Sequence, residues 1–136
     1  IGIPFLRWWQ TGAERFFRRQ GVALERWHIL KGPYRGGRPQ EEGIQRGEDF
    51  LRRQIESNRP VACLHWFGAS TLPVLEGPGN RTTNMNLHWV VVTAIAKDKG
   101  VAKVTVSSCG QKYILPLADF LAGSPAFITP SFRQKP

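Results

Sequence analysis

The chain has 136 residues and a formal net charge of +9, and this length is typical of one domain. Its hydrophobic content of 41%, with five tryptophans and eight phenylalanines, supports a buried core and excludes a disordered chain. No run of about eighteen apolar residues and no signal-peptide pattern occurs, so we expect a soluble protein without a membrane span, either cytoplasmic or secreted. The two cysteines, Cys63 and Cys109, are too few for a disulfide framework and are predicted to be thiols.

The positive charge is concentrated between Ile1 and Arg59, where nearly all basic residues are arginines. Clustered arginine indicates either binding of phosphate or acidic groups, or helix faces that are simply solvated. No motif of a nucleic-acid-binding fold accompanies the charge, so nucleic acid is not the favoured partner.

The N-terminal third predicts a helix, a strand and a loop. Large apolar residues recur at spacings of three and four across Pro4–Arg19, which is typical of an amphipathic helix. Val22–Leu30 is short and rich in large apolar residues and is predicted to be a strand. Lys31–Gly43 is rich in glycine and proline and is predicted to be a loop.

The central part predicts a second helix, Ile44–Ser57, which ends before Pro60. Val61–Phe67 is almost continuously apolar, as expected of a strand buried on both faces, with Cys63 in its middle. Gly68–Asn86 is predicted to be irregular.

Two β-rich runs, Trp89–Ala96 and Val101–Val106, are joined by the short turn Lys97–Gly100 and predict an antiparallel hairpin. The remaining predicted elements are a strand at Lys112–Leu115, a helix at Pro116–Ala122, a strand at Ala126–Thr129 and a polar tail at Arg133–Pro136. This order indicates an α+β fold, an antiparallel sheet meander with the N-terminal helices packed against it.

The hairpin also predicts a site. His88 directly precedes its first strand, and Ser107 and Ser108 follow its second, so both ends should meet at one edge of the sheet. A histidine with a polar residue that orients its ring is the base half of a nucleophilic site. The spacing is equally compatible with a histidine that caps a strand end beside hydroxyls by accident.

Four segments resemble a known family: R-P-V-A-C-L-H-W, L-H-W-V-V-V-T-A-I, V-T-V-S-S-C-G-Q-K-Y-I-L and L-A-D-F-L. They resemble the C-terminal half of the C39-like cysteine peptidases of bacteria, which have a papain-like fold, over roughly Ile44 to Thr129. The resemblance implies a single papain-like domain over residues 1–136, with His88 as the catalytic histidine. Ser107 and Ser108 fall where that family commonly has Asp or Asn as the third member of the triad.

The nucleophile that the resemblance implies, a cysteine at a helix start near the N-terminus, has no counterpart between Ile1 and Lys31. We therefore expect one of three arrangements. The cysteine lies upstream of Ile1, on a separate or lost segment; or the chain is a pseudoenzyme that binds peptides or small ligands; or Cys109 or Cys63 serves in a rearranged site. Cys109 follows the expected orienter in a turn, whereas Cys63 is expected to be inert in a buried strand.

The sequence thus predicts a domain that hydrolyses or binds peptides or proteins, with His88 as base and then acid, and Ser108 as orienter. No cofactor is implied, and the three histidines, His28, His65 and His88, show no metal-ligand spacing. The alternative is a non-catalytic basic module that binds an acidic partner or nucleic acid through Trp8, Trp9 and the arginines of the first helix.

Overall fold

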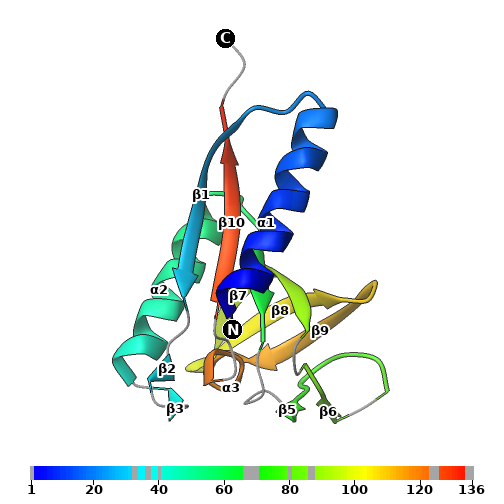
Figure 1. Ribbon diagram of the computed structural model, residues 1–136. Coiled ribbons are helices and arrows are strands. Elements are labelled where there is room, and N and C mark those ends of the chain that lie inside the picture. The colour runs from blue at the N-terminus through cyan, green and yellow to red at the C-terminus, as the bar shows by residue number, and fades with distance from the viewer. Residues whose placement is uncertain are drawn as a thin grey trace.

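The computed structural model describes residues 2–31, 34–35, 38–39, 41–65, 71–79, 81–85, 88–122 and 126–133 (Figure 1). Its helices and strands are, in chain order, α1 (Gly2–Arg19), β1 (Leu24–Lys31), β2 (Tyr34–Arg35), β3 (Arg38–Pro39), α2 (Glu41–Glu56), β4 (Val61–Leu64), β5 (Leu72–Pro73), β6 (Thr82–Thr83), β7 (Trp89–Asp98), β8 (Val101–Ser108), β9 (Gln111–Pro116), α3 (Leu117–Ala122) and β10 (Ala126–Phe132). The predicted α+β class is confirmed.

Six of the strands form one antiparallel sheet in the order β1-β10-β4-β7-β8-β9. The predicted meander is correct for β7, β8 and β9 alone. The last strand, β10, lies between β1 and β4, so the first and last strands of the chain are neighbours in the sheet. In contrast to β7–β8–β9, this arrangement depends on pairings that are distant in sequence.

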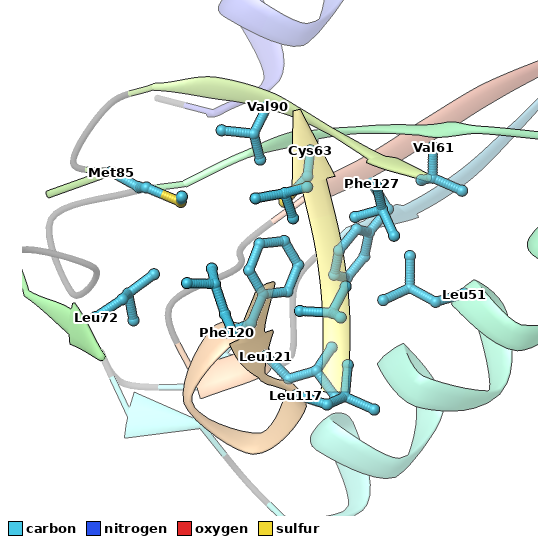
Figure 2. Packing of buried hydrophobic residues seen from close by; sticks show 14 of the residues in the cluster. Leu51, Val61, Cys63, Leu72, Met85, Val90, Leu117, Phe120, Leu121 and Phe127 are labelled. Carbon is cyan, nitrogen blue, oxygen red and sulfur yellow. The ribbon is translucent and has the colours of Figure 1, made fainter. Parts of the chain in front are cut away.

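The two faces of the sheet carry different cores, because side chains alternate along each strand. On one face, Val61 and Cys63 pack with Leu51 of α2 and Phe120 of α3 in a large cluster (Figure 2). On the other face, Ala62 belongs to a small cluster that is completed by aromatic side chains from α1 and the strands. The helices therefore cover both faces of the sheet.

Aromatic and polar contacts attach α1 to the sheet. Trp9 stacks on Trp89, with ring centroids 5.2 Å apart, and meets Trp27 edge to face at 5.7 Å. The indole N–H of Trp27 donates to Glu14 Oε1 at 2.7 Å. Trp8, by contrast, is 68% exposed.

Several predicted boundaries shift for local reasons. Helix α2 begins at Glu41 rather than Ile44, since acidic residues are favourable in a first helical turn. The predicted loop Lys31–Gly43 contains the short pair β2–β3, and Pro116 ends β9 instead of starting a helix. Trp66 and Phe67, expected to end the strand of Cys63, lie outside the described residues.

Two tight turns connect the meander. Lys99 and Gly100 link β7 to β8 with φ of 50° and 81°, and Cys109 and Gly110 link β8 to β9 with φ of 50° and 77°. Positive φ at both central residues defines the type I′ turn, whose twist matches that of the strands. Because β8 continues to Ser108, Cys109 occupies the tip of the second turn.

No helix in the described ranges combines the length and the apolar character needed to cross a membrane.

Candidate active site around His88

His88 and Ser108 lie side by side at one edge of the sheet. His88 immediately precedes β7, and Ser108 is the last residue of β8. The distance between His88 Nε2 and Ser108 Oγ is 2.8 Å, which is a hydrogen bond. The structure therefore brings together the two side chains that the hairpin pattern predicted to meet.

Ser107 is not brought to His88. Val106 points into the large core, so strand alternation directs Ser107 to the opposite face, where it is exposed opposite Val91. Of the two serines named as candidates, the geometry selects Ser108, since it shares the face of the large core with His88.

Cys109 lies next to the same histidine. Its Sγ is 3.8 Å from His88 Nε2, and its side chain is exposed at the tip of the β8–β9 turn. This thiol can therefore exchange a proton with the imidazole and remains accessible to a ligand.

Cys109 and Ser108 approach the same ring nitrogen. A neutral imidazole nitrogen either donates one hydrogen bond or accepts one, so the thiol and the hydroxyl compete for Nε2. Among the described residues, no hydrogen bond reaches Nδ1 of His88. His88 consequently has one nitrogen with two candidate partners and a second nitrogen that these residues leave open.

Cys63 is the other thiol, and it is part of the core. It is fully buried in β4 and packs in the cluster that contains Val61, Val90 and Phe127 (Figure 2). Its place in the middle of a buried strand confirms the expected location and separates it from solvent.

His65 is a further residue of this site that sequence reasoning did not use. Its backbone N–H donates to the carbonyl of His88 at 3.1 Å, and its ring lies 4.6 Å from that of Phe120. Burial lowers the pKa of His65 to about 3, with a further contribution from His88. A neutral, fully buried imidazole thus belongs to the residue whose backbone pairs with the half-buried His88.

The pairing of β4 with β7 explains this second histidine. Leu64 lies opposite Trp89 in the antiparallel register, so the residues that follow and precede them, His65 and His88, are neighbours. The sequence shows two apolar strands, each with a histidine at one end. Predicting that His65 and His88 are neighbours also requires the knowledge that these two strands pair.

The alternative binding surface is only partly formed. Trp9 stacks on Trp89 and does not share a free surface with the exposed Trp8. The arginines Arg15, Arg18 and Arg19 are exposed on α1. Trp9 is therefore part of the packing of α1 on the sheet, whereas Trp8 and the three arginines are exposed on this helix.

The described parts of the chain contain no group of three His, Cys, Asp or Glu side chains arranged to hold a metal ion. The clefts among the described residues lie away from His88 and include one of about 440 Å³ beside β10 and a polar one of about 640 Å³ between β1 and α2. Comparison with protein-family models, with curated proteins and with solved structures gives no match.

Proposed function

We propose that this chain is a papain-like domain of the cysteine-peptidase type, which binds peptides and hydrolyses their amide bonds through His88. One observation carries the proposal: His88 Nε2 lies 2.8 Å from a hydroxyl and 3.8 Å from an exposed thiol. A thiol, an imidazole and a polar group that fixes the imidazole are the parts of a thiol-based acyl-transfer site.

In the proposed reaction, the Cys109 thiol gives its proton to His88 Nε2 as Sγ attacks the carbonyl carbon of the peptide. A C–S bond forms, the C–N bond breaks, and His88 returns the proton to the departing amine. Water then attacks the thioester while His88 removes its proton, and this step releases the acid and restores the thiol. Cys109 is the thiol within reach of His88 among the described residues.

Ser108 positions the ring in this scheme. It contacts Nε2, the nitrogen that takes the thiol proton, so its hydroxyl donates to the neutral ring and accepts from the N–H once the imidazolium has formed, and it carries no negative charge. A carboxylate at this place would stabilise the imidazolium more strongly, because hydrogen bonds to charged groups are roughly twice as strong as neutral ones. The proposed site therefore differs from a triad, in which the orienting group bonds the ring nitrogen that the nucleophile does not use.

Peptide hydrolysis by paired cysteine variants tests this assignment. We expect Cys109→Ala to abolish cleavage of a fluorogenic peptide library, and Cys63→Ala, checked for folding by circular dichroism, to retain it. If Cys109→Ala keeps full activity while His88→Ala loses it, Cys109 is not the nucleophile, and because the other cysteine of the sequence, Cys63, is buried, the thiol would have to come from a separate segment. Full activity in His88→Ala would refute the proposal.

A second function, binding of an acidic partner by α1, is favoured by one observation. Trp8 is 68% exposed on the same helix as Arg15, Arg18 and Arg19. Attraction between exposed charges is screened by salt. Binding of polyglutamate that quenches Trp fluorescence and weakens steeply with added NaCl would support this function, and no quenching at low salt would exclude it.

A further inference from the structure

The polar cleft between β1 and α2 is a second candidate site, on a different part of the sheet. It has a volume of about 640 Å³ and is lined by residues that include Arg26 and His28 from β1, Arg53 and Gln54 from α2, and Arg59. In the sheet, β10 and β4 separate β1 from β7, the strand that His88 precedes. The proposed peptidase site and this cleft are therefore distinct.

Positive charge dominates the lining of this cleft. Three arginines face it, with Glu56 as the only carboxylate among its lining residues. In the parts of the chain that the structure describes, the ion pairs are Arg52–Glu48 and Lys103–Asp98, and neither involves a cleft arginine. The three guanidinium groups are thus left without carboxylate partners there.

Arg59 is held in place by a buried amide. Its Nε donates to Gln54 Oε1 at 2.8 Å, and its backbone N–H donates to the carbonyl of Gln54 at 2.9 Å. Gln54 itself is 5% exposed. Because these contacts use Nε and the backbone, the described residues leave the two terminal nitrogens of the guanidinium available for a ligand.

His28 reports the electrostatic character of the cleft. Its Nε2 lies 3.0 Å from Ser131 Oγ, which donates to Glu25 Oε1 at 3.0 Å. Burial lowers the pKa of His28, the charges of Arg26 and Arg59 lower it further, and Glu25 opposes them. A positive charge on His28 is therefore disfavoured by the same arginines that would attract an anion.

We propose that this cleft binds the phosphate or carboxylate group of a small acidic ligand, with Arg59 as the principal contact and Arg26 and Arg53 as flanking charges. The planar guanidinium matches the oxygen spacing of both groups and binds them through two parallel hydrogen bonds. The volume of the cleft is within the range of small-molecule sites.

Calorimetric titration with inorganic phosphate and, separately, with citrate tests the site and distinguishes the two chemistries. We expect saturable binding of at least one anion. Arg59→Gln should weaken this binding about tenfold, because it removes the guanidinium that makes two parallel hydrogen bonds. Arg59→Lys should retain only part of the affinity, since lysine keeps the positive charge but cannot make the two parallel hydrogen bonds. Arg46→Gln, at an exposed position of α2 outside the lining of the cleft, is the control and should bind as the wild type.

Arg53→Gln is a second variant that separates loss of binding from loss of folding. Arg59→Gln leaves the buried Gln54 with an altered partner, whereas Arg53 is exposed and its loss disturbs no hydrogen bond recorded among the described residues. Arg53→Gln should weaken binding without changing the melting temperature. Equal weakening by Arg46→Gln and Arg59→Gln, or no saturable binding of either anion, would overturn the proposal.

The imidazole of His28 gives an independent readout by NMR. A bound anion favours the charged form of His28, so its pKa should rise when phosphate or citrate is added. His28→Gln identifies the correct resonance among the three histidines of the sequence. Saturable binding that leaves the His28 titration unchanged would place the anion elsewhere.

Discussion

The molecule contains two histidine–serine pairs with almost the same contact. His88 Nε2 is 2.8 Å from Ser108 Oγ, and His28 Nε2 is 3.0 Å from Ser131 Oγ. The third neighbour of the imidazole nitrogen differs: for His88 it is the thiol of Cys109, and for His28 it is Arg26 Nε at 3.4 Å, while Ser131 donates a hydrogen bond to Glu25.

That third neighbour determines what each pair can do. An imidazole beside a thiol can accept its proton and generate a nucleophile. Because Ser131 already donates its hydrogen bond to Glu25, the contact between His28 and Ser131 is a fixed part of the structure beside the cleft that holds the three arginines. A histidine–serine contact alone therefore does not identify a catalytic site.

The buried histidine behind the first pair gives the largest expected effect. In the folded state the pKa of His65 is about 3, against 6.5 for the unfolded group, so the unfolded chain binds a proton first as pH falls. We expect the free energy of unfolding to decrease between about pH 6.5 and 3, by up to about 5 kcal/mol from this group.

Urea denaturation of the wild type and of His65→Leu at several pH values measures this contribution. The difference between the two unfolding free energies should change with pH in that window and become constant above about pH 7. A difference that is independent of pH would show that His65 is not held neutral by the fold.

Replacing each histidine with glutamine tests whether the two pairs differ in their contribution to peptide hydrolysis. His88→Gln should reduce peptide hydrolysis by about 100-fold or more, because general acid–base catalysis contributes at least that factor. His28→Gln should leave the rate within about twofold, since its neighbours contain no thiol. Steady-state kinetics on one peptide decides, and equal losses in the two variants would mean that the pairs do not differ in function.

The two serines should separate activity from stability. Ser108→Ala is expected to lower hydrolysis about tenfold with little effect on unfolding, since the lost hydrogen bond only positions the ring. Ser131 is 8% exposed, and Ser131→Ala should destabilise the fold by about 1–2 kcal/mol while hydrolysis is retained. Kinetics combined with thermal denaturation of both variants tests this, and the reverse pattern would contradict it.

The smallest expected effect concerns the turn that carries the thiol. Cys109 and Lys99 share a φ of 50°, a conformation in which asparagine is favoured over other residues with side chains. Cys109→Asn and Lys99→Asn should each stabilise the protein by about 0.5 kcal/mol. A gain in stability with a loss of hydrolysis only for Cys109→Asn would show that the cysteine is retained for its chemistry.

Local patterns made part of this structure predictable. The glycine of the Lys99–Gly100 turn and the alternation of β7 and β8 were enough to bring His88 and Ser108 to one edge. Choosing between Ser107 and Ser108 required the register, because a shift of one residue exchanges the two faces of a strand.

The second pair could not be predicted from local patterns. Positions 28 and 131 are 103 residues apart, and they meet because β10 lies against β1. No turn or spacing encodes such a contact; it follows from burial of Ile128 and Phe127 on opposite faces of a strand between β1 and β4. Local patterns therefore did not indicate the cleft beside His28.

The rate at which Cys109 is alkylated near pH 6, in the wild type and in His88→Ala, tests the proposed active site most directly. Iodoacetamide with peptide mass mapping distinguishes Cys109 from the buried Cys63, which should not react while the protein is folded. If His88 takes the proton of this thiol, the wild type should react about tenfold faster than the variant. Equal rates in the two proteins would contradict the account.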